Sequence, residues 1–255
     1  MSLLDDIVSS TRARIEVLKS DDIGELARRA GAAPAPRGFT NALQTDGVAI
    51  IGEIKRASPS KGPLDPGLDA GKTAHLYAQG GASAISVLTE PDFFRGSLED
   101  LEAAVAAGLP VLRKDFVLDG AQVLEARAAG ADAVLLIVRI LGEELSGLLE
   151  ETRSLGMDAL VEVYDESDVD IALGAGADLI GVNNRDLETF EVDPERTAKL
   201  AAGLPEDVLA VGLSGVSTRA EVEALEAAGA RAVLIGESLV TAPDPAAKLR
   251  ELLGS

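Results

Sequence analysis

Four Gly-Ala pairs recur along the chain at intervals of roughly 50 residues. They begin at Gly81, Gly130, Gly176 and Gly229, and each lies between an Ala-rich helical pattern and a short apolar run. Because glycine adopts the left-handed conformation in which many helices end, each pair is expected to stop a helix. The period is twice the length of a strand-plus-helix unit, so the pattern predicts a further strand between each two repeats.

Apolar runs occur at all the positions that this pattern requires. The predicted strands are residues 48–55, 84–88, 110–116, 133–138, 159–163, 179–182, 208–214 and 232–235. Helical patterns follow them at residues 70–79, 98–107, 121–129, 143–155, 166–173, 194–202, 218–228 and 245–253. Apolar strands that alternate with helices are typical of a parallel sheet covered by helices. Eight such units in about 205 residues favour a closed (β/α)8 barrel over an open doubly wound sheet, and no Gly-x-Gly-x-x-Gly motif opens the first helix.

A segment of helical character precedes the first strand. Apolar residues between Leu3 and Leu18 recur at helical spacing, residues 30–37 are rich in Gly, Ala and Pro, and residues 38–43 are consistent with a short helical turn. We therefore predict one α/β domain over residues 1–255. It is a single TIM barrel at residues 47–255 with an N-terminal helical extension at residues 1–46.

The composition excludes several classes of function. The chain has no Cys and one His, which rules out a thiol nucleophile, disulfides and the usual Cys- or His-rich zinc sites, so no metal is expected. A formal net charge of −20 argues against nucleic acid, whose binding depends on neutralising phosphates. No apolar run is long enough to span a membrane, and the first residues lack a secretory signal. These features predict a cytoplasmic protein without a membrane partner, and a monomer is the default state of association.

The first predicted strand ends in charged residues that face the same way. Glu53 and Lys55 are two positions apart, so both project from one face of the strand, and a polar loop at residues 58–63 follows them. Burying these charges is costly unless they are paired or used. In (β/α)8 barrels the active site lies at the C-terminal ends of the strands, so this strand end predicts a site.

The other strand ends supply more polar groups. Together with two glycines, the residues at these ends are Thr89, Glu90, Arg113, Lys114, Asp115, Arg139, Glu162, Asn183, Asn184, Arg185, Ser214, Gly215, Gly236, Glu237 and Ser238. Two lysines (Lys55 and Lys114) and two carboxylates (Glu53 and Glu162) at one rim suggest proton transfer. The residues alone leave two alternatives open: structural ion pairs Glu53–Lys55 and Lys114–Glu162, and Schiff-base chemistry on either lysine.

Small residues after the last two strands indicate an anion site. Ser214-Gly215 and Gly236-Glu237-Ser238 stand where these barrels commonly bind phosphate through loop amides and a helix N-terminus. Phe93, Phe94 and Phe116 follow the second and third strands. Aromatic residues are scarce in this chain, so this cluster is consistent either with an aromatic substrate or with plain packing.

These residues resemble the indole-3-glycerol phosphate synthase family. The resemblance extends from about Phe39 to the C-terminus. It is carried by the following segments: Ile51-Gly52-Glu53-Ile54-Lys55-Arg56-Ala57-Ser58-Pro59-Ser60, Ser86-Val87-Leu88-Thr89-Glu90-Pro91, Leu112-Arg113-Lys114-Asp115-Phe116, Leu135-Leu136-Ile137-Val138, Leu160-Val161-Glu162-Val163, Gly181-Val182-Asn183-Asn184-Arg185-Asp186-Leu187 and Leu234-Ile235-Gly236-Glu237-Ser238-Leu239. It implies a (β/α)8 barrel that converts the phosphorylated substrate 1-(2-carboxyphenylamino)-1-deoxyribulose 5-phosphate to indole-3-glycerol phosphate, without cofactor or metal, in tryptophan biosynthesis.

The resemblance also implies roles for individual residues. Lys114 is expected to be the general acid for ring closure, Glu162 to act with it in dehydration, and Lys55 to hold the substrate carboxylate. Glu53 is expected to orient the lysines, Asn183 to position substrate hydroxyls, and Ser214 to complete the catalytic set. The remaining residues are expected to bind the phosphate or line the aromatic pocket: Ser58, Phe93, Phe116, Leu135, Arg185, Leu187, Gly215, Gly236 and Glu237.

One position departs from the family pattern. The family normally reads Glu-Ser-Gly after the seventh strand, whereas this chain reads Leu213-Ser214-Gly215. Leucine neither transfers a proton nor orients an ammonium group, so we expect impaired turnover with substrate binding largely kept. Leu213 is also the one feature that favours a non-catalytic barrel that binds a phosphorylated aromatic metabolite. The related isomerase phosphoribosylanthranilate isomerase is disfavoured, because its acid–base pair includes a first-strand Cys.

Overall fold

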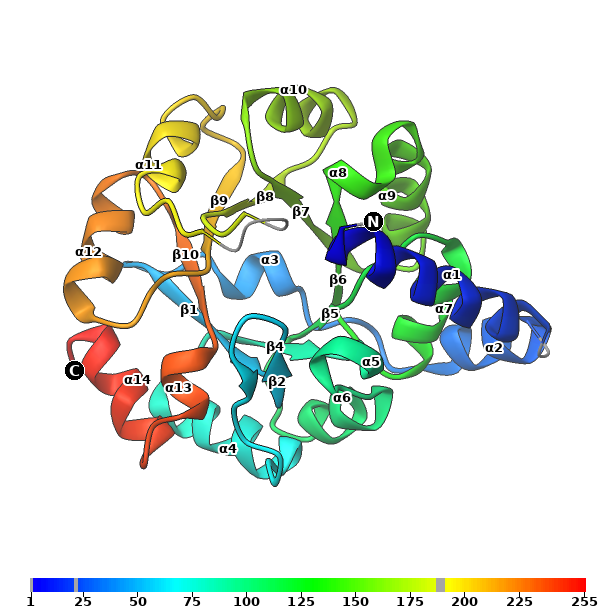
Figure 1. The fold of residues 1–255 in the computed structure, drawn as a ribbon, viewed down its shortest axis with the longest axis horizontal. Helices are drawn as coiled ribbons and strands as arrows, with labels where there is room; N and C mark the ends of the chain where they lie inside the picture. Colours follow the sequence, from blue (N-terminus) through cyan, green and yellow to red (C-terminus); the bar gives the residue numbers. More distant parts are fainter. Residues whose placement is uncertain (1, 21–22, 187–190) are drawn as a thin grey trace.

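The computed structural model describes residues 2–20, 23–186 and 191–255, and its centre is a closed barrel of parallel strands (Figure 1). The order around the ring is β1-β10-β9-β8-β7-β6-β5-β4, so the first and last strands pair and close it. The strands are β1 (Ala49–Ile54), β4 (Ala84–Leu88), β5 (Val111–Lys114), β6 (Ala133–Ile137), β7 (Asp158–Val163), β8 (Leu179–Asn183), β9 (Leu209–Leu213) and β10 (Ala232–Ile235). The predicted TIM barrel is confirmed, and each predicted strand contains or overlaps an observed one.

A ring of helices surrounds the strands. It consists of α4 (Ala70–Gly80), α6 (Leu98–Val105), α7 (Gly120–Ala128), α9 (Leu145–Ser154), α10 (Glu166–Gly174), α11 (Arg196–Ala201), α12 (Arg219–Ala227) and α14 (Pro245–Leu253). Gly81, Gly130, Gly176 and Gly229 all have positive φ, between 82° and 98°. The prediction that these glycines end helices in the left-handed conformation is therefore confirmed.

Several short elements at the C-terminal ends of the strands were not predicted. They are the two-stranded hairpin β2 (Ala57–Ser58) and β3 (Gly62–Pro63) and the helices α5 (Pro91–Phe94), α8 (Val138–Leu141) and α13 (Glu237–Val240). Each is too short to produce a recognisable hydrophobic period. None of the helices in the described part of the chain combines the length and the hydropathy that crossing a bilayer requires.

Residues of each strand alternate between two cores. The inward side chains, including Ile51, Leu112, Leu135, Leu160 and Val211, fill the barrel. The outward side chains pack under the helices; on β1 they include Ile50 and Ile54. This alternation follows from the two-residue period of a strand. It decides which residues at a strand end face the barrel axis and which face the helices.

The N-terminal extension reaches both ends of the barrel. Its first helix lies near the C-terminal ends of the strands, where Arg14 pairs with Glu90 and Asp115, and its last helix closes the opposite end. The extension comprises α1 (Leu3–Ser20), α2 (Ile23–Ala32) and α3 (Phe39–Ala42). In Figure 1, α3 lies across the centre of the ring, α2 lies outside the ring beside α7, and α1 runs from the edge of the barrel across α7. Phe39 and Leu43 of the last helical segment are buried against the inner core of the barrel, at the end where the strands begin. The Thr40 amide donates to Asp158, the first residue of β7, at 2.9 Å. One end of the barrel is thus filled, and the other is left for a site.

Candidate active site

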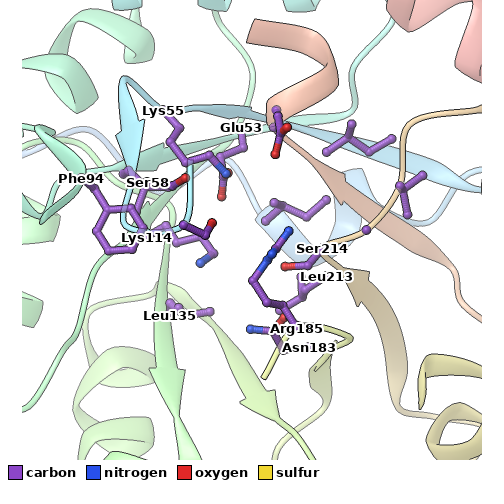
Figure 2. Close-up of a pocket in the computed structure, with 18 of the residues that line it drawn as sticks. Glu53, Lys55, Ser58, Phe94, Lys114, Leu135, Asn183, Arg185, Leu213 and Ser214 are labelled. Atoms are coloured by element: carbon purple, nitrogen blue, oxygen red, sulfur yellow. Dashed lines mark hydrogen bonds and ion pairs between the residues drawn. The ribbon is translucent and has the colours of Figure 1, made fainter. Parts of the chain in front are cut away.

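A cavity of about 470 Å³ lies at the C-terminal ends of the strands, and every strand of the barrel contributes to its wall. Figure 2 shows Lys55, Ser58, Phe94 and Lys114 on one side of it, and Asn183, Arg185, Leu213 and Ser214 on the other. Of the residues predicted for the site, these line the cavity: Glu53, Lys55, Ser58, Lys114, Phe116, Leu135, Glu162, Asn183, Arg185, Ser214, Gly215, Gly236 and Glu237. Leu187 lies outside the described residues.

The strand period separates the site residues from their charged neighbours. Lys114 faces the cavity, whereas the guanidinium of the preceding Arg113 is directed toward α7. There Arg113 donates to the carbonyl of Gln122 at 2.8 Å and forms an ion pair with Glu125 at 2.8 Å. Arg113 is therefore part of the packing between the barrel and its helices. The charged strand end at residues 113–115 places the Lys114 ammonium group and the buried Asp115 in the cavity wall.

Glu53 and Lys55 form a close ion pair at the edge of the cavity. Nζ of Lys55 lies 2.6 Å from Oε1 of Glu53, whose side chain is almost fully buried. Burial alone would raise the pKa of the Glu53 carboxyl, but the positive charges of Lys55, Lys114 and Arg185 outweigh it and lower that pKa. Glu53 is therefore ionised at neutral pH. Its negative charge draws these cations toward one region of the cavity.

Gly236 makes room for this carboxylate. A Cβ atom at position 236 would lie 2.3 Å from Oε1 of Glu53, which is well inside van der Waals contact. The glycine at the end of β10 is thus required by a side chain on β1, the strand that pairs with it. The sequence indicated a small residue here for an anion site, and the structure adds this second reason.

Glu162 and Asn183 lie side by side on β7 and β8. Nδ2 of Asn183 donates to Oε1 of Glu162 at 3.1 Å, and Oδ1 of Asn183 accepts from the amide of Arg185 at 3.0 Å. Oε2 of Glu162 is buried and has no hydrogen-bond partner in the described chain. Lys114 is therefore not paired with this carboxylate, and the predicted alternative of a structural Lys114–Glu162 ion pair is wrong. A buried oxygen without a partner is available to a bound molecule.

Backbone of unusual conformation forms the wall after β9. Ser214 has φ of 67° and Gly215 has φ of 81°, and both line the cavity. A non-glycine residue in the left-handed region costs about 1–3 kcal/mol, and such strain clusters at functional sites. On the adjacent strand, Gly236 precedes the short helix α13, whose first residue Glu237 forms an ion pair with Lys61 at 3.4 Å.

The aromatic part of the wall differs from the prediction in one residue. Phe94 and Phe116 line the cavity with ring centroids 6.2 Å apart, whereas Phe93 is not among the lining residues. The buried carboxylate of Glu90 accepts hydrogen bonds from three successive amides at the start of α5, including those of Phe93 and Phe94. This cap fixes the helix so that its last residue, Phe94, faces the cavity. Glu90, which the sequence placed at the rim, is a capping residue.

Apolar side chains that the sequence did not predict for the site also line the cavity. They include Leu88, Ile137 and Leu234, which end or nearly end their strands and face inward. The two-residue period, counted from a recognised inward residue, would have found them. The described residues contain no group of three or more acidic or histidine side chains that could hold a metal ion.

The fold and this cavity define a (β/α)8 barrel with ionisable side chains gathered at the C-terminal ends of its strands. A family model described as indole-3-glycerol phosphate synthase matches residues 4–252. Relatives of that name come from Mycolicibacterium vanbaalenii (49% identical, over 99% of this chain and 94% of its own length) and Roseiflexus sp. (50% identical, 99% and 98%). A third, from Micrococcus luteus, is 50% identical over 98% and 96%. The chain belongs to the indole-3-glycerol phosphate synthase family, whose members are carboxy-lyases of tryptophan biosynthesis.

Solved structures with little sequence similarity share the fold. Thiamine phosphate pyrophosphorylase from Pyrococcus furiosus has a TM-score of 0.62 to this chain at 17% identity, and covers 81% of this chain and 94% of that one. A structure described as "Native KDPGal structure" has a TM-score of 0.61, also at 17% identity, and covers 83% of this chain and 95% of that one. At this identity the likeness concerns the barrel alone.

Proposed function

We propose that this chain converts 1-(2-carboxyphenylamino)-1-deoxyribulose 5-phosphate to indole-3-glycerol phosphate, with release of carbon dioxide and water. The observation that supports this most directly is the meeting of Glu53, Lys55, Lys114 and Glu162 in one cavity. The substrate has a carboxylate, a phosphate and a carbonyl that must be protonated. The cavity offers two ammonium groups, a carboxylate with a free oxygen, and a wall of exposed backbone.

In the first step, the aromatic carbon that bears the carboxylate attacks the ketone carbon of the sugar chain. The new bond breaks the carbonyl π bond, so the oxygen takes up a proton and becomes a hydroxyl group. Lys114, at the C-terminal end of β5 and facing the cavity, is assigned as the donor. Glu53 keeps this ammonium group in place through the negative charge that also binds Lys55.

Loss of carbon dioxide restores the aromatic ring. The electrons of the breaking carbon–carbon bond return to the ring, whose nitrogen carries the positive charge after ring closure. Lys55 is assigned to hold the departing carboxylate, since its ammonium group lies at the edge of the cavity and is 18% exposed. The ion pair with Glu53 holds the Lys55 ammonium group at this edge of the cavity.

Dehydration then forms the indole double bond. A proton leaves the carbon next to the nitrogen, and the new hydroxyl group leaves as water after protonation. Glu162 and Lys114 are assigned as the base and acid of this step, and the unpartnered Oε2 of Glu162 is the accepting atom. Asn183, which fixes the other oxygen of Glu162, is assigned to hold a substrate hydroxyl.

The phosphate and the aromatic ring of the substrate are assigned to different residues of the cavity wall. The phosphate is assigned to backbone around Ser58, Gly215, Gly236 and Glu237, with Ser214 beside it. Arg185 lines the same cavity and helps to lower the pKa of Glu53. The aromatic ring is assigned to Phe94, Phe116 and Leu135, with Phe94 in the place expected for Phe93.

Leu213 gives the alternative proposal, a barrel that binds the substrate without turning it over. Its side chain is 1% exposed and lines the cavity between Asn183 and Ser214. The groups assigned to each step are nevertheless present on other strands. We therefore favour catalysis at a reduced rate.

Formation of product separates the enzyme from the binder. The chain should be mixed with the substrate, and indole fluorescence and released carbon dioxide should rise together. A Lys114→Ala variant with an unchanged unfolding midpoint should lose both signals by about 10²–10⁴-fold. Binding of substrate without either signal in the unmodified chain would refute catalysis, and full activity of the variant would refute the role of Lys114.

We also propose that the protein is a monomer and that it works in the cytoplasm. The location is supported by its family, which acts in amino-acid biosynthesis on a small phosphorylated molecule. Cell fractionation tests the location. Light scattering of the purified chain, compared with a mass of 26.2 kDa, tests the state of association.

A further inference from the structure

Asn184 is a buried polar residue that the proposed reaction does not use. It follows the last residue of β8 and its side chain is only 2% exposed. It does not line the cavity, but both of its neighbours, Asn183 and Arg185, do. Its side chain connects three parts of the fold, which are the end of β8, the start of α11 and the segment after β9.

The hydrogen bonds of this amide determine its orientation. Oδ1 accepts from the backbone amide of Thr197 at 3.0 Å and from its hydroxyl at 2.8 Å. Nδ2 donates to the backbone carbonyl of Ser214 at 3.2 Å. A backbone N–H can only donate and a carbonyl can only accept, so the amide cannot be flipped without losing both contacts.

The carbonyl that Asn184 binds belongs to the strained residue of the site. Ser214 is one of only two non-glycine residues with positive φ in the described chain, and Gly215 beside it is also left-handed. The backbone amide of Asn184 in addition donates to the carbonyl of Leu213 at 3.0 Å. Two consecutive carbonyl groups, those of Leu213 and Ser214, are thus held by one residue. This is the point at which the chain turns from β9 into the cavity wall.

Asn184 is itself anchored from the other side. Nη1 of Arg196 donates to the carbonyl of Asn183 at 3.0 Å and to that of Asn184 at 2.7 Å. The same guanidinium lies 3.6 Å from the centroid of the Tyr164 ring. Arg196 therefore holds the backbone of Asn184 in place even if the segment at Ser214 moves, and the Asn184 side-chain amide is a fixed hydrogen-bond donor for that segment.

We propose that Asn184 is a positioning residue, which holds Ser214 and Gly215 in the left-handed conformation and thereby sets the affinity for the substrate's phosphate group. The inference rests on the proposed function, because it takes this segment to be the phosphate site. Without the Nδ2 contact, the Ser214 carbonyl is left unsatisfied and the backbone is free to return to an ordinary conformation. The amides that the proposed function assigns to the phosphate would then change their orientation.

Direct binding tests this without depending on turnover. In a titration followed by phosphorus NMR, Asn184→Asp should bind inorganic phosphate about tenfold more weakly than the unmodified chain, because a carboxylate oxygen replaces the donor. Anthranilate, which has the aromatic carboxylate but no phosphate, should bind with unchanged affinity. In turnover assays the variant should show a higher KM and a kcat within about threefold of the original. Asn184→Ala removes the donor without adding a buried charge. It should likewise weaken phosphate binding and raise KM, with anthranilate affinity unchanged and kcat nearly so.

Thr197→Val is the matched control. It removes the hydroxyl that donates to Oδ1 but keeps the Thr197 amide and the Nδ2–Ser214 contact, so its phosphate affinity should stay unchanged even if its unfolding midpoint falls. Equal phosphate affinity in Asn184→Asp, Asn184→Ala and the unmodified chain would overturn the inference. The inference would also be overturned if Thr197→Val weakened phosphate binding as much as the Asn184 variants do, or if the Asn184 variants lost affinity for phosphate and for anthranilate by the same factor. If the unmodified chain bound no phosphate that the substrate displaces, the proposed phosphate site would fail and the inference with it, whereas absence of indole product alone would overturn only catalysis.

Discussion

The carboxylate of Glu53 occupies the space that a side chain at Gly236 would need. A Cβ atom at position 236 would lie 2.3 Å from Oε1 of Glu53, on the neighbouring strand. Gly236→Ala should therefore displace this carboxylate and, with it, Lys55. Since a shift of about 1 Å at a catalytic group can cost 10²-fold in rate, we expect kcat to fall by about that factor. Steady-state kinetics measure the change.

Gly147 provides the control for this substitution. It lies within α9, and a methyl group added to it would meet no other atom within 4 Å, so Gly147→Ala should leave kcat unchanged and raise stability by about 0.5–1 kcal/mol. A Gly236→Ala variant as active as Gly147→Ala would show that the position of Glu53 does not limit the reaction.

Leu213→Glu should increase kcat. The new carboxylate would enter the cavity between Asn183 and Ser214, where it can orient an ammonium group or transfer a proton. Acid–base groups contribute about 10²–10⁴-fold, and because other groups already serve this chain we expect an increase of about tenfold or more. The buried charge should lower the unfolding midpoint. Leu213→Gln has the shape of the glutamate variant without its charge, so comparing the two separates the effect of the charge from that of the side-chain shape. Equal kcat in the unmodified chain, Leu213→Glu and Leu213→Gln would contradict the prediction.

The stabilising contribution of Glu53 should disappear in acid. Its pKa is lower in the folded chain than its ordinary value of 4.5, because the charges of Lys55, Lys114 and Arg185 outweigh burial. A carboxylate with a lowered pKa stabilises the fold above pH 4.5, and the contribution is lost as the pH falls through the folded-state value. The free energy of unfolding should therefore exceed that of Glu53→Gln at neutral pH, and the gap should narrow below pH 4.5. Urea titrations from about pH 3 to 8 measure it. A gap that is constant over this range would refute the lowered pKa.

The N-terminal extension should unfold together with the barrel, as one domain. Phe39 is fully buried in the barrel core, so Phe39→Ala should cost about 3–5 kcal/mol of unfolding free energy. The two tyrosines of the chain, Tyr77 and Tyr164, both belong to the barrel, whereas far-ultraviolet circular dichroism also reports the N-terminal helices. The two probes should give coincident urea transitions in both chains. A separate transition seen by circular dichroism alone would mean that residues 1–46 fold independently.

Much of the site could be predicted because strand ends in a closed barrel must converge. Glu53, Lys114, Glu162 and Asn183 come from four different strands, and recognising the strands was enough to bring them together. The sequence was ambiguous where β5 ends. Arg113, Lys114 and Asp115 are consecutive and charged, and the sequence does not show that Lys114 and Asp115 line the cavity whereas Arg113 does not.

Other features depend on contacts that no local pattern encodes. Phe94 rather than Phe93 reaches the cavity because the Glu90 carboxylate caps a helix of four residues. Glu90 and Asp115 lie 3.5 Å and 3.7 Å from the Arg14 guanidinium, which comes from α1 in the N-terminal extension. Asn184 looked like a repetition of Asn183, and only its contacts with Thr197 and Ser214 distinguish it. Such long-range contacts arise from the packed fold.

The pairing of β1 with β10 has a consequence for the synthesis of the chain. Ile51 stands opposite Leu234 and Gly52 opposite Ile235, so the strand that bears Glu53 acquires one of its two neighbours only when nearly the whole chain has been made. Until then, a growing chain on the ribosome has an unpaired edge on β1. It also lacks Gly236, beside which the Glu53 carboxylate is buried in the folded protein. The ordered site is therefore completed by the last strand to emerge, and a chain that ends before β10 should have no activity.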